Sequence, residues 1–299
     1  MKSVFCAWIK ASRVASNAYI VFPLLLGAAL YKQETGQVSY RFLAVTLLFS
    51  VAVQLFIVYS NDYADVETDR HNKTFTPFSG GSRVLVDGEL SRRQLGTAAL
   101  VALAVCMSVG LLLVFLGRSG GPVFAAISIL LMWAYSYRPI RLSYRGGGEL
   151  LQMAGVGGLL PLFGYYIQAG SIGLFPWGYL AVLLPLNLAC AVSTTLPDEP
   201  SDRLGHKQTF SVMAGISKAK LLVVLLYVSA LLIYAAANWD LLAPCRLVAV
   251  VTVPVLAAAG MMYFGMRAVP GERAMLFFVF FSIMFTVFFT AGMALVAVL

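Results

Sequence analysis

Charged side chains are scarce in this sequence. Of its 299 residues only 11% are Asp, Glu, Lys or Arg, whereas 60% are hydrophobic. A soluble domain of this size does not need so much apolar surface, and the hydrophobic residues form runs of about 20 instead of amphipathic stripes. The composition therefore excludes a soluble globular protein and predicts an all-α, polytopic membrane protein.

Cysteine and histidine are also rare. The two histidines, His71 and His206, lie far apart in the sequence and do not have the spacing of a zinc site. The four cysteines are Cys6, Cys106, Cys190 and Cys245. They are widely separated too, so we expect neither a thiolate metal site nor disulfides.

The apolar residues form nine runs that are long enough to be candidate membrane spans. We expect nine transmembrane helices around a central cavity, in one domain that covers residues 1–299. The runs lie at roughly 14–31, 42–60, 95–117, 121–137, 149–168, 175–196, 219–237, 244–265 and 275–298.

Basic residues predict the orientation of these spans. With nine spans, 17 of the 21 Lys and Arg residues fall on the side of the amino terminus, and only Lys32, Arg41, Arg118 and Arg246 fall opposite. Basic residues collect in cytoplasmic loops, so we expect the amino terminus and the loops on its side to be cytoplasmic. The net charge of +8 favours contact with anionic lipid headgroups or an anionic substrate, and it gives no reason to expect nucleic acid.

Acidic residues are concentrated on the same side. Eleven of the thirteen are there, the exceptions being Glu34 and Asp240. Acidic residues have little influence on topology, so their asymmetry indicates chemistry at the cytoplasmic face.

The segment NDYADVETD, from Asn61 to Asp69, follows the second apolar run. Asn61, Asp65 and Asp69 are spaced i, i+4 and i+8, so they share one face if the helix continues past Tyr59. Asp62 lies about 100° around the same turn. Carboxylates with a neighbouring amide are ligands that suit Mg²⁺, with a substrate phosphate completing its coordination.

A second acidic cluster follows the sixth apolar run. Asp198 and Asp202 repeat the i, i+4 spacing in the segment DEPSD. We expect the two clusters to form the facing halves of one metal and diphosphate site.

Basic and glycine-rich segments accompany these clusters. The turn SGGS, Ser79 to Ser82, precedes Arg83 and would let backbone N–H groups approach an anionic oxygen. Arg13 and Asn17 on the first helix either reach into a cavity or, for the arginine, extend to the lipid headgroups. After the fourth run, the hydroxyl groups of Tyr135 and Ser136 are followed by Arg138 and Arg141. The planar guanidinium of arginine can bind two phosphate oxygens at once.

These features fit the ionisation of a prenyl diphosphate. Loss of diphosphate leaves a strongly negative leaving group, which Mg²⁺ and basic side chains would neutralise, and an allylic carbocation. An apolar cavity that excludes water would protect that cation. The isoprenoid tail of the substrate partitions into lipid, which explains a location in the membrane. The hypothesis from the residues is therefore an intramembrane prenyl transfer.

The two acidic segments resemble the paired motifs of the UbiA superfamily of intramembrane prenyltransferases. NDYADVETD is similar to its NDxxDxxxD motif, and DEPSD to its DxxxD motif. The resemblance implies Mg²⁺-dependent transfer of an isoprenoid from its diphosphate to an aromatic acceptor. The implied metal ligands and catalytic residues are Asn61, Asp62, Asp65, Asp69, Asp198 and Asp202. The candidate diphosphate-binding residues are Arg13, Asn17, Lys73, Arg83, Tyr135, Ser136, Arg138, Arg141 and Lys207.

One segment bears on the acceptor. YSYRPIRLSYRGGGE, which ends at Glu149, is similar in outline to the 1,4-dihydroxy-2-naphthoate prenyltransferase branch of this superfamily, which serves menaquinone synthesis. Two alternatives remain open. A terpene cyclase of the same superfamily would use the same metal site without an acceptor. A secondary transporter would also carry acids within the membrane, although transport sites lie near the midplane and these acids lie at span ends.

Overall fold

The computed structural model describes residues 4–238 and 244–299, with side chains from residue 250 onward in the second range. Regular structure in these ranges is helical, apart from an isolated bridge between Thr76 and Ser79. The predicted all-α class is therefore confirmed. Asp240 and Arg246 were predicted to lie on the side opposite the amino terminus. Asp240 and the side chain of Arg246 lie outside the described residues, so these two predictions are not tested.

The helices follow one another along the chain without long interruptions, except between α3 and α4. Their bounds are α1 (Val4–Ser12), η1 (Val14–Ser16), α2 (Asn17–Thr35), α3 (Tyr40–His71), α4 (Arg92–Phe115), α5 (Gly121–Ser136), η2 (Leu142–Tyr144), α6 (Gly148–Gln152), the π-helical η3 (Met153–Leu159), α7 (Leu160–Ala169), α8 (Gly178–Thr195), η4 (Leu196–Asp198), α9 (Glu199–Leu204), α10 (Phe210–Ala214), α11 (Ile216–Ala237), α12 (Pro244–Gly265) and α13 (Arg273–Val298).

The chain is an integral membrane protein. Within the described residues, seven helical segments are long and apolar enough to cross a membrane, and Gly121–Ser136 and Val250–Gly265 are shorter apolar helices. All nine predicted runs coincide with helices, but only seven of them meet this criterion within the described residues. The number of nine crossings, like the central cavity, therefore stays a prediction.

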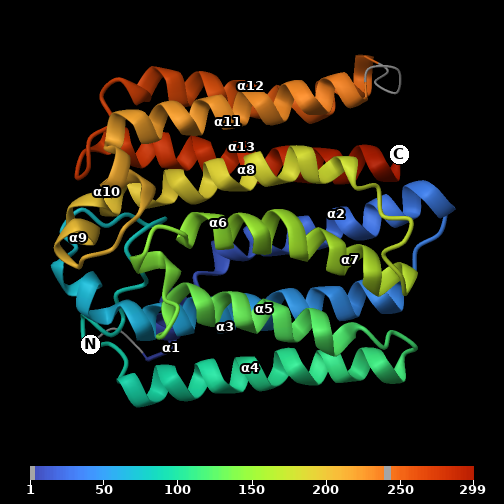
Figure 1. The fold of residues 1–299 in the computed structure, drawn as a ribbon, viewed down its shortest axis with the longest axis horizontal. Helices are drawn as coiled ribbons and strands as arrows, with labels where there is room; N and C mark the ends of the chain where they lie inside the picture. The colour runs from blue at the N-terminus through green and yellow to red at the C-terminus, as the bar shows by residue number, and fades with distance from the viewer. Residues whose placement is uncertain (1–3, 239–243) are drawn as a thin grey trace.

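The long helices lie side by side along one direction (Figure 1). Helix α2 packs against α7, α13 and α3, while α8 packs against α11. The short helices α9 and α10 lie at the end of the bundle that also holds the amino terminus, and the carboxyl terminus lies at the other end (Figure 1). Termini at opposite ends agree with an odd number of crossings.

Helix α3 carries the first acidic segment beyond the apolar part of the bundle. The Ser39 side chain caps its first turn by accepting the Phe42 N–H, and the helix continues for 32 residues to His71. At 1.5 Å per residue this is roughly 48 Å, longer than the ~30 Å hydrocarbon core of a bilayer. The predicted continuation past Tyr59 is confirmed, and it places Asn61 to Asp69 at the end of the bundle near α9.

Candidate active site

The carboxylates of the first cluster are buried at the end of α3. Asp62 and Asp65 are only 3% and 2% exposed, and Asp69 is also buried. Buried carboxylates are costly unless cations or hydrogen-bond donors surround them. Their partners therefore reveal how this site is built.

Asp65 accepts hydrogen bonds from three side chains. The Asn61 amide Nδ2 and the Lys207 Nζ each lie 2.9 Å from its Oδ2, and the Tyr144 hydroxyl lies 3.0 Å from its Oδ1. Asn61 belongs to the same helix, whereas Tyr144 and Lys207 come from two other connections. Asp65 is thus the point at which three segments of the chain meet.

Lys207 joins the two acidic clusters. Its Nζ also lies 3.8 Å from Asp202 Oδ1, and its side chain is only 11% exposed. Burial lowers the pKa of this ammonium, but the attraction of Asp65 and Asp202 outweighs burial, so the pKa of Lys207 is raised well above its usual value. The two clusters, distant in sequence, therefore lie together around one positive charge.

The connection between α3 and α4 forms a second link. Asn72 Nδ2 and the Gly80 N–H each donate to Asp198, at 2.8 Å. The Ser82 N–H and hydroxyl donate to Asp62, which also pairs with the Arg13 guanidinium. The glycine-rich turn does bring N–H groups to anionic oxygens, as expected, and these oxygens belong to the acidic clusters themselves.

Glycine is required at the centre of this turn. Gly81 has a φ of +71°, a left-handed conformation that side chains disfavour. A Cβ on Gly81 would overlap Asp69 Oδ2 and lie 3.2 Å from Asp62 Oδ1. The backbone therefore passes directly against two carboxylates of the first cluster.

Left-handed backbone also occurs at non-glycine residues around the site. Within the described residues, positive φ angles at such positions are found at Arg13, Arg83, Arg141 and His206. Each belongs to a segment that supplies a contact to the clusters. Such conformations cost of order 1–3 kcal/mol each and gather at functional sites.

Arg141 and Tyr135 are further predicted diphosphate ligands that lie close to the acidic clusters, and the predicted ligand Ser136 follows Tyr135 in the sequence. Arg141 stacks on the Tyr144 ring, with its Cζ 3.4 Å from the ring centroid. Tyr135 is near enough to Lys207 to influence it electrostatically. Ser136 is buried, and its hydroxyl has no hydrogen-bond partner in the described part of the chain.

Four other predicted ligands are placed differently. The Asn17 amide donates to the Ser50 carbonyl, and the Arg83 guanidinium donates to the carbonyls of Asp69 and Asn72 at the end of α3. Lys73 and Arg138 are exposed, and neither side chain has a hydrogen bond or ion pair to another described residue. Contact of these four with a diphosphate stays a prediction.

Tyr144, Asn72 and the Ser82 hydroxyl were not among the predicted site groups. Burial and the charge of Asp65 raise the pKa of Tyr144, so its hydroxyl stays protonated and can donate to that carboxylate. Tyr144 lies in the same segment as Arg141, and the other two lie beside Lys73 and Arg83. Their neighbours were identified from charge, which Tyr, Asn and Ser lack.

The donor set suits a hard divalent cation. No group of three or more His, Cys, Asp and Glu side chains among the described residues is gathered closely enough to hold a metal ion. The carboxylates are instead held by Lys207, Arg13 and the 72–82 connection. Because the oxygens come from carboxylates and an amide, with no thiolate or imidazole ligand, they fit Mg²⁺ once these internal donors are exchanged.

The fold and the site together define an α-helical integral membrane protein with an acidic, buried polar site at one end of its helix bundle. The chain belongs to the UbiA prenyltransferase family, whose profile matches residues 20–284. It is therefore a prenyltransferase, and the transporter alternative is wrong.

A curated relative and two solved structures support this assignment. The chain is 26% identical over 222 residues to a 1,4-dihydroxy-2-naphthoate octaprenyltransferase of Mycobacterium tuberculosis, which covers 73% of each protein. The apo structure of a UbiA homologue from Aeropyrum pernix K1 has a TM-score of 0.69 at 18% identity and covers 93% of this chain and 96% of that one. A UbiA homologue from Archaeoglobus fulgidus, solved with DMAPP and Mg²⁺, has a TM-score of 0.67 at 13% identity and covers 96% and 98%.

Proposed function

We propose that this prenyltransferase moves an isoprenoid chain from a prenyl diphosphate to an aromatic acceptor, in a Mg²⁺-dependent reaction at the cytoplasmic end of the bundle. The observation that carries the proposal is the meeting of the two acidic clusters around Lys207, 2.9 Å from Asp65 and 3.8 Å from Asp202. The arrangement concentrates oxygen ligands and a fixed cation in one buried place.

The residues divide into two roles in this proposal. Asn61, Asp62, Asp65, Asp69, Asp198 and Asp202 would hold Mg²⁺. When bound, Mg²⁺ neutralises the diphosphate oxygens and makes the diphosphate a better leaving group.

Basic and hydroxyl side chains act on the diphosphate directly. Lys207 and Arg13 supply fixed positive charge beside the carboxylates, and their N–H groups would donate to phosphate oxygens if the carboxylates held Mg²⁺. The Ser136 hydroxyl, which is buried and has no partner among the described residues, provides another donor. Both roles rely on burial, because charges interact more strongly away from water.

The bond changes follow from these roles. The C–O bond of the prenyl diphosphate breaks, and its electron pair leaves with the diphosphate. The allylic carbon then forms a C–C bond to a ring carbon of the acceptor, and that ring carbon loses its proton. The surrounding helices keep water from the carbocation.

We further propose 1,4-dihydroxy-2-naphthoate as the acceptor, which would place the enzyme in menaquinone synthesis. The named activity of the mycobacterial relative supports this choice. So does the outline of the segment from Tyr135 to Glu149. If the enzyme prenylates a different aromatic acid, the proposed acceptor is wrong but the proposed prenyl transfer is right.

The test combines product analysis with matched variants. Purified protein, Mg²⁺, several prenyl diphosphates and a panel of aromatic acids are incubated, and the products are identified by mass. Asp65→Asn and Asp198→Asn should each lower the rate by at least about 100-fold, because each removes an anionic ligand from the charge-stabilising site. Glu67→Gln is the control, since Glu67 is on the same helix but is exposed and pairs with Arg70.

Metal removal provides an independent result. EDTA should stop the reaction, and Mg²⁺ should restore it. Full activity in Asp65→Asn or in EDTA would refute the proposed site. A hydrocarbon product formed without any acceptor would instead identify a cyclase that uses the same residues.

A further inference from the structure

Two cavities lie on the outside of the bundle, where exposed apolar side chains line them. The first, of about 720 Å³, runs between α3 and α4, with Trp8 of α1 across one end. The second, of about 900 Å³, lies between α3, α4 and α5. They flank α4, and Arg93 and Thr97 line both of them.

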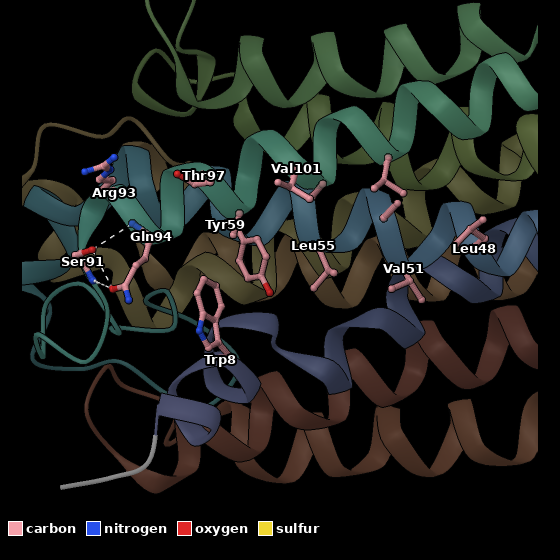
Figure 2. A pocket seen from close by; sticks show the side chains of 14 residues that line it. Trp8, Leu48, Val51, Leu55, Tyr59, Ser91, Arg93, Gln94, Thr97 and Val101 are labelled. Atoms are coloured by element: carbon pink, nitrogen blue, oxygen red, sulfur yellow. Dashed lines mark hydrogen bonds between the residues drawn. The ribbon is translucent and has the colours of Figure 1, made fainter.

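The first cavity is an elongated apolar groove. Figure 2 shows Leu48, Val51 and Leu55 following one another along its floor, with Val101 above them. Along α4 it extends from Ser91 to Val105, which is roughly 21 Å at 1.5 Å per residue. Half of a ~30 Å hydrocarbon core is about 15 Å, so the groove is long enough for an acyl chain of one leaflet.

The second groove has similar dimensions. Along α4 it extends from Arg92 to Leu103, or roughly 16 Å. Leu100 and Leu130 line it and are 67% and 57% exposed, so it also opens toward lipid. The two apolar grooves therefore run along the two sides of α4, and each is about as long as an acyl chain.

Positive charge is confined to one end of both grooves. Arg92 and Arg93 begin α4, and among the described residues no carboxylate lines either groove. The Arg92 Cζ lies 4.6 Å above the Tyr63 ring centroid, and one of its terminal nitrogens donates to the Tyr63 carbonyl at 3.4 Å, which leaves its other N–H groups for a ligand. Arg93 has no ion pair within the described chain. The adjacent Ser91 and Gln94 side chains bond each other and cap the helix, as Figure 2 shows, so the two guanidinium groups are the charges available to a ligand.

We propose that one anionic diacyl phospholipid straddles the start of α4. Its two acyl chains lie in the two grooves, and Arg92 and Arg93 bind its phosphate. Two chains that diverge from one headgroup match two grooves that share Arg93 at a single end. Arginine suits this headgroup because its planar guanidinium can bind two phosphate oxygens.

The experiment measures lipid retention by the full-length protein. Protein in mild detergent is exchanged into equal amounts of phosphatidylglycerol and phosphatidylcholine, and bound lipid is counted by native mass spectrometry. The unmodified chain should retain phosphatidylglycerol preferentially. The double variant Arg92→Gln/Arg93→Gln should lose this preference by about tenfold or more, since each arginine near an anionic headgroup contributes substantially to binding.

The control double variant is Arg267→Gln/Arg273→Gln. Both arginines are exposed, Arg267 in the connection after α12 and Arg273 at the start of α13, so the total charge changes equally while the grooves do not change. It should retain phosphatidylglycerol as the unmodified chain does. Equal loss in both double variants would overturn the proposal, because it would show a general charge effect.

Groove occupancy is tested separately. Val101→Trp fills the first groove and should reduce retention, whereas Val114→Trp, at an exposed position on α4 outside both grooves, should not. A one-chain lysophosphatidylglycerol should be retained less than the diacyl lipid. Equal retention of the one-chain lipid, or unchanged retention in Val101→Trp, would overturn the two-groove geometry.

Discussion

Gly81 is a residue at which the site tolerates little change. Its left-handed φ and its contact with Asp69 leave no room for a side chain. Gly81→Ala should therefore displace the 72–82 connection or the carboxylate, and lower kcat/KM by about 100-fold, the cost of a shift of about 1 Å in a catalytic group. The measurement is kcat/KM for prenyl transfer at saturating Mg²⁺, compared between Gly81→Ala and the unmodified protein.

Gly88→Ala is the matched control for this substitution. Gly88 lies in the same connection with a φ of +67°, but an added Cβ would meet no atom within 4 Å. Both variants carry the same backbone strain of about 1–2 kcal/mol, and only Gly81→Ala crowds the acidic cluster. If the two variants lost activity equally, contact with Asp69 would not explain the requirement for glycine.

At this scale, spacing and charge predicted the acidic residues but not all of their partners. The i, i+4 pattern placed Asn61, Asp65 and Asp69 on one face because a helix fixes that geometry. Tyr144 and Asn72 reach the site through irregular connections, and no periodicity predicts the path of such a connection. Arg83 was expected at a phosphate, but the exposed carbonyls at the end of α3 bind its guanidinium.

Helices α2 and α7 approach each other closely enough for their backbones to touch. An added Cβ on Gly164 would overlap the Leu24 carbonyl oxygen, and one on Gly27 would overlap the Pro161 carbonyl oxygen. Small residues allow membrane helices to pack closely, and here they let two backbones touch. We expect Gly164→Ala to force α2 and α7 apart and to lower the melting temperature of the detergent-solubilised protein by several degrees, an effect of about 1–3 kcal/mol.

Gly158→Ala provides the reference for this comparison. Gly158 precedes α7 in the same continuous helical segment, and an added Cβ there would lie 3.8 Å from its nearest neighbour, Leu184 Cδ2. Alanine should fit at this position and leave the melting temperature nearly unchanged. A similar decrease in both variants would mean that glycine matters here for a reason other than helix contact.

Hydrophobic runs predicted where helices occur better than where they break. Pro23, Pro185 and Pro254 all lie inside helices. By contrast, the first helical segment is interrupted at Arg13, where the sequence contains neither glycine nor proline. The interruption coincides with the ion pair between Arg13 and Asp62, a tertiary contact that a local sequence pattern does not reveal.

For the whole molecule, the distribution of charge agrees with the arrangement of the bundle. Lys32 donates to the Val298 carbonyl, so this basic residue, predicted to lie opposite the amino terminus, lies at the carboxyl-terminal end. Arg118 donates to the Ile167 and Gln168 carbonyls, in the last turn of α7.

The excess of basic residues predicts that the active-site end is cytoplasmic. Thiol labelling tests this with Arg203→Cys at the active-site end and Gln37→Cys between α2 and α3, both exposed positions, in a chain whose Cys6 and Cys245 are replaced by serine. A membrane-impermeant maleimide added to intact cells should label Gln37→Cys and spare Arg203→Cys, and inverted vesicles should reverse the pattern. Because a diphosphate is too highly charged to cross the hydrocarbon core, the site must face the compartment that supplies its substrate. Labelling of Arg203→Cys in intact cells would therefore reverse both the orientation and the side from which the prenyl diphosphate enters.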